Sequence, residues 1–147
     1  MTVGVFDGVH RAHQHLIRST VRLARRLKGK SVVVTFDPDP RAVLDPDHAP
    51  PALMPLHARL SQLRELGVEW VWVVPFTRAF ARTRAESFIR RVLQTQLRAA
   101  ALIVGESFAF GRDRRGNMAT LRALAPAIGM RVVALKDIRR GGAPISS

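Results

Sequence analysis

Cysteine and tyrosine are both absent from this chain of 147 residues, and lysine occurs only at positions 28, 30 and 136. The lack of cysteine excludes disulfide bonds and thiolate metal sites. No apolar run approaches the roughly 18 residues that cross a bilayer. The first residues also lack the basic segment and apolar stretch of a secretory signal. We therefore expect a cytoplasmic protein without a membrane partner.

Acidic residues are scarce, with 11 against 24 basic residues and a formal net charge of +13. Such a surplus favours anionic ligands, among them nucleotides, nucleic acids and acidic membranes. The arginines are spread along the whole chain, in pairs such as Arg25-Arg26, Arg90-Arg91, Arg114-Arg115 and Arg139-Arg140. A solvated basic surface that serves no partner gives the same pattern. The charge alone therefore does not identify a ligand.

Apolar β-branched runs alternate with segments of helical periodicity, which predicts an α/β fold. Strands are expected at residues 2–5, 31–36, 68–74, 101–104 and 131–135, and helices at 12–27, 55–66, 83–96 and 117–128. Because helices join the strands, we expect one five-stranded parallel sheet with helices on both faces. At this length, residues 1–147 are expected to form a single domain.

Local signals indicate where these helices lie and what separates them. A capping box over residues 83–86 is expected to open the third helix. Five prolines between Asp37 and Pro51 predict a loop that contains neither helix nor central strand. In the first helix, four residues follow steps of four, three and four and share one face: Leu16, Thr20, Leu23 and Leu27.

The loops that follow the strands have unusual compositions. They cover residues 6–13, 37–40, 75–80 and 105–115, and each comes after the carboxyl end of a predicted strand. Ligands of open parallel sheets bind outside these carboxyl ends. We therefore expect the four loops to converge on one ligand-binding edge.

The first of these loops has the features of a phosphate site. A strand ends at Val5, a tight turn uses Asp7 and Gly8, and a helix begins with His10 and His13 in its first turn. Free backbone N–H groups and the positive end of the helix dipole favour an anion at such a place. Residues three apart share a helix face, so both imidazoles can contact one phosphate, which would favour their cationic form.

Two other interpretations of these histidines stay open. Zinc needs further ligands, and neither a nearby glutamate nor a cysteine completes a set with His10, His13 and His15. Solvated histidines at the start of a helix would give the same spacing. We expect no metal site, and the strand–turn–helix context favours the phosphate interpretation.

The segment Gly4–His13, with Gln14 after it, closely resembles the first motif of the prokaryotic FAD synthetases. This family is the adenylyltransferase module of bifunctional riboflavin kinase/FMN adenylyltransferases. Other segments resemble its later motifs in order and spacing: residues 33–40, 75–81 with 85–89, 104–116 and 145–147. The resemblance covers essentially the whole chain and implies a Rossmann-like nucleotidyltransferase fold.

The resemblance implies transfer of AMP from ATP to the phosphate of FMN, which gives FAD and pyrophosphate with the help of Mg²⁺. His10 and His13 would contact the ATP phosphates as catalytic residues. The nucleotide would be bound by Gly4, Phe6, Asp7, Gly8, Ala12, Gly105, Phe110, Gly111, Arg112, Ser146 and Ser147. The flavin would lie near Asp37, Pro38, Asp39, Phe76 and Phe80. Packing in the core is an equally good explanation for Phe6, Phe80, Phe108 and Phe110.

Several positions depart from the family pattern. Ala12 replaces a glycine, and its methyl group adds bulk where the nucleotide approaches the backbone. Asp39 stands between two prolines in place of a histidine, and Ser107 and Ala109 replace a polar residue and an arginine. The last motif stops at Ser147, before its threonine and arginine and before a riboflavin kinase domain, so kinase activity is not expected.

These departures leave two alternatives to an active FMN adenylyltransferase. One is a relative that binds a nucleotide without turning it over. The other is a basic module that binds nucleic acid through its arginines. Nucleic acid is the less expected partner, because no nucleic-acid motif is present and no tyrosine is available for stacking on bases. Nothing in the sequence indicates an oligomeric state.

Overall fold

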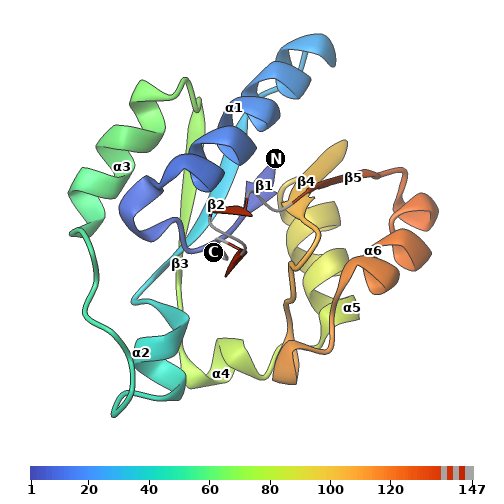
Figure 1. The fold of residues 1–147 in the computed structure, drawn as a ribbon. Helices are drawn as coiled ribbons and strands as arrows, with labels where there is room; N and C mark the ends of the chain where they lie inside the picture. The colour runs from blue at the N-terminus through green and yellow to red at the C-terminus, as the bar shows by residue number, and fades with distance from the viewer. Residues whose placement is uncertain (137–138, 141–142, 145–147) are drawn as a thin grey trace.

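A computed structural model describes residues 1–136, 139–140 and 143–144 (Figure 1). The strands are β1 (Thr2–Val3), β2 (Val32–Asp37), β3 (Trp70–Pro75), β4 (Ala101–Gly105), β5 (Arg131–Leu135), β6 (Arg139–Arg140) and β7 (Ala143–Pro144). The α-helices are α1 (Arg11–Arg26), α2 (Pro40–Leu44), α3 (Leu56–Glu65), α4 (Arg78–Ala81), α5 (Ala85–Ser87) and α6 (Met118–Leu124). The other helical segments are η1 (Asp7–Val9), the π-helix η2 (Phe88–Gln96), η3 (Arg112–Arg114) and η4 (Pro126–Ile128).

The main strands are parallel, but they form two sheets. β2 lies between β1 and β3 in a three-stranded sheet, and β4 pairs with β5 in a two-stranded sheet. The predicted parallel α/β arrangement is present, whereas one continuous five-stranded sheet stays a prediction. The two sheets meet at Met1, whose N–H donates to the Ala101 carbonyl at 2.8 Å and whose carbonyl accepts from the Ile103 N–H at 2.9 Å. β1 ends at Val3, two residues before the predicted strand end.

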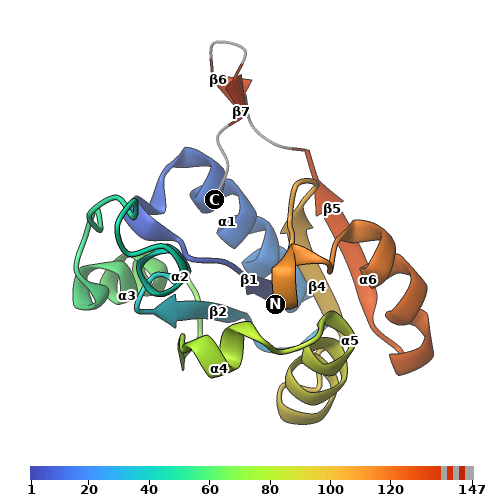
Figure 2. The ribbon, with the colours of Figure 1, turned by 90° about the horizontal axis from the view of Figure 1, so that it is seen from below.

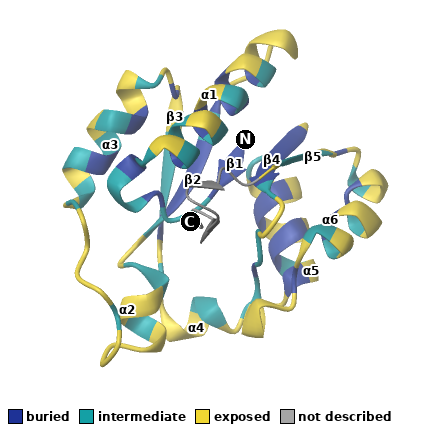
Figure 3. Cartoon of the chain, in the orientation of Figure 1, coloured by how far each residue is buried: buried dark blue, intermediate teal, exposed yellow. Residues whose placement is uncertain are grey.

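Helices cover both faces of the strands, as predicted (Figure 2). Successive residues of a strand point to opposite faces. Val33 packs with Ile17 of α1 and Leu63 of α3, whereas Val34 belongs to the cluster that contains Leu93 of η2 and Leu121 of α6. Figure 3 shows β1 and β4 as buried strands, while the outer faces of the helices are exposed. The arrangement is therefore a helix–sheet–helix sandwich.

The buried residues of α1 are not the leucines whose spacing predicted the buried face of this helix. Ile17, Val21 and Ala24 are buried against the strands, together with Thr20. Leu27 is 43% exposed. Leu16 and Leu23 are half-buried, so the predicted face lies beside the face that packs on the strands, and only Thr20 belongs to both.

Three predicted boundaries also change. The proline-rich loop contains α2, because Pro40 occupies the first helical turn, where its missing N–H costs nothing. The third predicted helix begins at Ala85 without the capping box, since its N-cap is Arg84, and it continues as a π-helix. The last predicted helix is interrupted before Pro126, which opens a separate 3₁₀ turn.

The carboxyl ends of β2 and β3 lead into α2 and α4 at the same edge of the fold (Figure 1). None of the helices that the structure describes has both the length and the hydrophobicity required to cross a bilayer.

Candidate functional site

The loop between β1 and α1 has an unusual backbone. Phe6 has a φ of 56°, Val9 has a φ of 38°, and Gly8 has a φ of 73°. Positive φ values are costly for residues other than glycine, so contacts with the surroundings must hold this loop in place. One such contact needs Gly4, because a Cβ there would lie only 3.0 Å from the ring of Phe6, which is fully buried.

His10 and His13 lie together at the start of α1. Their rings stack with centroids 3.5 Å apart and an angle of 24° between the planes. His13 is only 4% exposed, and its ring meets the edge of Phe6 at 5.3 Å. Three ring nitrogens have no hydrogen-bond partner within the described part of the chain: Nδ1 and Nε2 of His13, and Nδ1 of His10. Buried polar atoms normally have one, so this pair is a candidate ligand site.

The pKa values of the two histidines follow from this environment. Burial and the neighbouring His10 lower the pKa of His13 to about 4, against a smaller opposing effect of the Asp7 carboxylate. Burial also lowers the pKa of His10 below its ordinary value. At neutral pH His13 therefore has one N–H donor and one lone pair, and neither is satisfied. A bound phosphate would supply an acceptor and favour the protonated ring.

Backbone donors of α1 lie beside the histidine pair. No side chain caps this helix, and the first helical bond of the turn runs from the Gln14 N–H to the His10 carbonyl at 2.9 Å. The N–H groups of residues 11–13 precede that bond and have no acceptor within the helix. Ala12 lies half-buried in this turn. The structure thus brings together His10, Ala12 and His13, three of the predicted nucleotide contacts.

Asp7 and Gly8 make contacts with a different loop. The Asp7 carboxylate accepts from the Leu53 N–H at 2.9 Å and from the Met54 N–H at 3.3 Å. A Cβ at Gly8 would lie 2.9 Å from Cδ1 of Leu53. These two residues, predicted to contact nucleotide, hold the 53–54 segment against the first loop.

A buried arginine that we did not predict joins the first loop to the second. Arg59 of α3 donates from Nη1 to the Val5 carbonyl at 2.7 Å, and its Nη2 lies 3.7 Å from Oδ1 of Asp37. The same carbonyl accepts from Thr35 Oγ1 at 2.8 Å. The sequence carried a signal for Arg59, because it lies four residues before the buried Leu63, on the apolar face of its helix.

The second loop contains three predicted flavin contacts. The Asp39 carboxylate caps α2 by accepting from the Arg41 N–H at 2.8 Å, and it also pairs with the Arg41 guanidinium at 2.9 Å. Burial alone would raise the pKa of Asp39, but the hydrogen bonds and charge of Arg41 bring it below the ordinary value. Asp37 and Pro38 are exposed at the end of β2. The Asp39 carboxylate is thus paired with a neighbouring cation.

Phenylalanine rings connect the second, third and fourth loops in a continuous row. Phe36 of β2 contacts Phe76 and Phe80, with ring centroids 5.6 and 6.0 Å away. Phe80 contacts Phe88 at 6.5 Å, and Phe88 contacts Phe110 at 5.6 Å. Phe108 stacks on the last of these at 5.4 Å. The predicted flavin contacts Phe76 and Phe80 are half-buried, and the predicted nucleotide contact Phe110 is buried.

The fourth loop is docked on the start of α5. Phe110 and Gly116 exchange two backbone hydrogen bonds of 2.9 Å. Gly111 has a φ of 72°, and a Cβ there would lie 2.8 Å from the backbone of Ala85. The Arg112 N–H donates to the Thr83 carbonyl at 2.7 Å, while its exposed guanidinium is 3.3 Å from Asp113.

The predicted loops are thus joined in series. Arg59 links the first to the second, Phe36 links the second to the third, and Phe88 links the third to the fourth. Gly105 ends β4 and leads into the fourth loop. The predicted contacts Ser146 and Ser147 lie outside the described residues.

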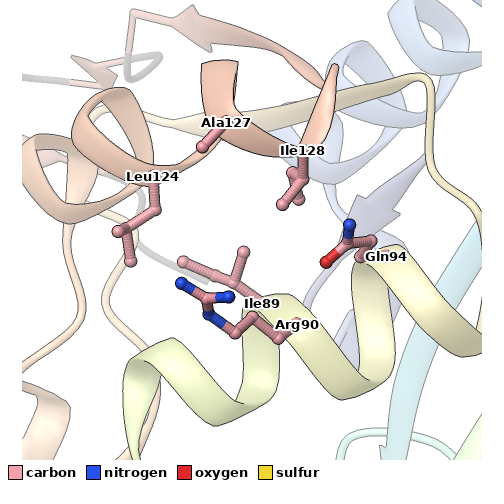
Figure 4. Close-up of a pocket in the computed structure, with 6 residues that line it drawn as sticks. All are labelled: Ile89, Arg90, Gln94, Leu124, Ala127 and Ile128. Atoms are coloured by element: carbon pink, nitrogen blue, oxygen red, sulfur yellow. The ribbon is translucent and has the colours of Figure 1, made fainter.

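A pocket of about 90 Å³ lies away from these loops (Figure 4). Ile89, Arg90 and Gln94 of η2 line one side, and Leu124, Ala127 and Ile128 line the other. It is smaller than the roughly 300 Å³ at which ligand pockets begin. The pocket therefore does not compete with the histidine pair as the candidate site. Among the described residues, no group of three or more His, Asp or Glu side chains could hold a metal ion.

Comparison with known proteins agrees with this geometry. The family described as FAD synthetase matches residues 1–147. The bifunctional riboflavin kinase/FMN adenylyltransferase of Escherichia coli K12 is 35% identical over 147 residues, which are the whole chain and 47% of that protein. The protein of the same name from Haemophilus influenzae is 36% identical over 129 residues, which are 88% of this chain and 42% of the relative.

A solved structure also has the same fold. It is described as a macrolide-efflux protein from Streptococcus pneumoniae, is 28% identical and superimposes with a TM-score of 0.84. The likeness covers 99% of this chain and 47% of that one. The chain spans about half the length of the bifunctional relatives named above. Since the family match runs from the first residue to the last, this chain belongs to the FAD synthetase family.

Proposed function

We propose that this chain is an FMN adenylyltransferase, which transfers AMP from ATP to FMN and gives FAD and pyrophosphate. The observation that carries the proposal is the His10–His13 pair at the amino end of α1, with ring nitrogens that lack partners in the described part of the chain. In a FAD synthetase family member, the triphosphate of ATP is the anion that would provide hydrogen-bond partners for these nitrogens. The names of the relatives include this activity.

The reaction requires alignment of the FMN phosphate with the α-phosphate of ATP and stabilisation of the charge on the leaving pyrophosphate. An oxygen of the FMN phosphate forms a bond to the α-phosphorus of ATP. The bond from that phosphorus to the bridging oxygen of the β-phosphate breaks, and its electron pair leaves with pyrophosphate. The FMN phosphate is already an anion, so no general base is required. The protein must hold the two phosphates in line and stabilise the departing charge.

The histidine pair and the amino end of α1 suit this task. His13 is neutral before binding and can donate one N–H to a phosphate oxygen. The free N–H groups and the positive dipole of α1 act on the same anion. As negative charge collects on the leaving pyrophosphate, protonation of the imidazoles becomes more favourable.

The two substrates are assigned to different loops. ATP would lie along the first loop and the loop that follows Gly105. FMN would lie beside residues 37–39, where the half-buried rings of Phe76 and Phe80 offer an apolar surface to the flavin. Arg41 offsets the Asp39 carboxylate, which reduces its repulsion of the substrate phosphates.

We assign Mg²⁺ to the ATP phosphates. The described residues do not form a protein site of three or more His, Asp or Glu ligands, so they do not fit a resident ion. Mg²⁺ often keeps its waters and binds through substrate phosphates, where it neutralises charge. No step above depends on a protein-bound metal.

We also propose that the five parallel strands act as one Rossmann-like sheet in the order β3-β2-β1-β4-β5, within a single domain. The two hydrogen bonds of Met1 to β4 support this order. A continuous sheet would place the first loop between the loops that follow β2 and β4.

The test is incubation of the purified chain with ATP, FMN and Mg²⁺, followed by chromatography for FAD and a coupled assay for pyrophosphate. We expect both products in equal amounts. If ATP raises the melting temperature but no FAD forms, the protein binds nucleotide without turnover. If neither substrate has any effect, both nucleotide functions are refuted. A salt-sensitive gel shift with RNA or DNA would instead support a nucleic-acid module.

Ala12→Gly tests how closely ATP approaches the backbone of α1. The loss of a methyl group should strengthen ATP binding if the nucleotide packs on this turn. The change costs up to about 1 kcal/mol of helix stability, which is measured separately by urea denaturation. Unchanged ATP affinity would refute the steric argument.

A further inference from the structure

Arg59 is the only buried arginine, lysine or carboxylate in the part of the chain that the structure describes, and it is 5% exposed. A buried cation is costly unless it is paired and fully hydrogen-bonded. Its nearest carboxylate oxygen, on Asp37, is 3.7 Å from Nη2, and its Nε has no partner among the described residues. Ion pairing that is this loose does not account for a charge at this depth.

The close contact of Arg59 is with the backbone of the first loop. Nη1 donates to the Val5 carbonyl at 2.7 Å, and Thr35 Oγ1 donates to the same oxygen at 2.8 Å. Two donors on one carbonyl fix the plane of the Val5–Phe6 peptide. Phe6 follows directly with its φ of 56°, a conformation that needs support from its surroundings. The guanidinium therefore acts at the point where β1 turns toward the histidine pair.

We propose that Arg59 is a positioning residue for the triphosphate, which holds the first loop in its ligand-ready shape through the Val5 carbonyl. This inference rests on the proposed function for the identity of the ligand. A site that is preformed in this way loses less conformational entropy on binding than a mobile loop does. The ligand affected is ATP, because Phe6, His10 and His13 follow Val5 on the same loop.

Asp37 provides a way to separate two routes of action. If Arg59 acts through Val5, then Thr35→Val, which removes the other hydrogen bond to that oxygen, should change ATP binding in the same direction. If it acts through Asp37, then Asp37→Asn should reproduce the Arg59 effect and Thr35→Val should not. The proposal commits to the first outcome.

The experiment compares Arg59→Gln, Arg59→Lys, Thr35→Val and Asp37→Asn with a control, Arg64→Gln, which changes an exposed arginine of the same helix. Hydrogen exchange of the peptide that covers residues 4–13 reports on the loop, and KM for ATP and for FMN reports on the site. Arg59→Gln should speed exchange in this peptide and raise KM for ATP about tenfold, the effect of losing one charged hydrogen bond. KM for FMN should change less than about twofold. Arg59→Lys keeps the positive charge and should show smaller changes in exchange and in KM for ATP than Arg59→Gln. Arg64→Gln should match the wild type.

Three results would overturn the proposal. The first is unchanged exchange of residues 4–13 in Arg59→Gln. The second is an equal rise in KM for both substrates with faster exchange throughout the chain, which indicates a general structural role. The third is an Asp37→Asn variant that reproduces the effect of Arg59→Gln while Thr35→Val does not. If Arg59→Gln does not fold, Arg59→Lys and Thr35→Val decide the question. If the wild type makes no FAD, the proposed function fails, while the exchange comparison still decides the role of Arg59.

Discussion

Replacement of His13 by phenylalanine should make the protein more stable and less able to bind ATP. The ring is 4% exposed, and neither of its nitrogens has a hydrogen-bond partner in the described part of the chain. Phenylalanine keeps the ring shape and removes both unsatisfied atoms. Near pH 7 we expect a gain in unfolding free energy of about 1 kcal/mol, at the low end of the cost of a buried unsatisfied group because phenylalanine is slightly larger.

The larger effect depends on pH. The pKa of His13 is about 4 in the folded protein, against 6.5 for a free histidine. In the interval between these values the unfolded chain binds a proton that the folded protein does not. Wild-type stability therefore falls as pH decreases from 6.5 toward 4 and is retained above 6.5. The difference of about 2.5 pH units corresponds to about 3.5 kcal/mol in total, at about 1.4 kcal/mol per unit. About 3 kcal/mol of this falls between pH 6.5 and 4, because titration is incomplete at both ends of the interval.

The assay is urea denaturation at closely spaced pH values from 4 to 8, for the wild type and for His13→Phe. Other groups titrate in both proteins, so the quantity to compare is the difference between the two unfolding free energies. It should grow by about 3 kcal/mol as pH falls from 6.5 to 4. The matched control is His15→Phe, which makes the same change at an exposed position of α1. If the difference in unfolding free energy between the wild type and His13→Phe is the same at every pH, the conclusion that His13 is buried in its neutral form is refuted.

Two further substitutions test contacts that hold the loops. Gly111→Ala should cost about 2–4 kcal/mol in urea denaturation, because the new Cβ meets backbone atoms at 2.8 Å at a φ of 72°. Gly129→Ala, at a φ of 68° but in open space, should cost only about 1 kcal/mol, and equal costs would contradict the packing argument. Asp7→Ala should lower the unfolding free energy by about 1–3 kcal/mol, since two backbone N–H groups lose their acceptor. Asp47→Ala, at an exposed turn, should be neutral, and equal effects would show that the Asp7 contacts contribute nothing.

Much of the fold could be predicted because local sequence and tertiary packing agree. The strand at 131–135 was predicted with its observed bounds, and β4 differs by one residue. These strands are β-branched runs that end at a glycine or a charged residue. The errors occur where a residue has two permitted uses. Pro40 can end a helix or begin one. Thr83 has the sequence pattern of a helix cap, but its N–H instead donates to the Phe80 carbonyl and closes the turn after α4.

Part of the geometry of the candidate site could be predicted, whereas the role of its residues stays a prediction. The spacing of His10 and His13 was enough to place both rings on one side of the first turn of α1, and they stack there. It did not indicate that Asp7 would bind the 53–54 backbone, because that contact joins segments 46 residues apart. Arg59 was missed for a related reason, since its partner Val5 lies 54 residues away. Sequence periodicity describes neighbours within one element, whereas these contacts depend on how elements pack.

The row of six phenylalanines has a consequence for protein engineering. A substitution at Phe80 removes a ring that contacts Phe88, which in turn contacts Phe110, and a substitution at Phe76 reaches this contact only through Phe80. The two ends of the row therefore cannot be redesigned as separate modules. A library that varies the proposed flavin contacts should randomise both ends together, because a single change at one end will shift the packing that the other end needs.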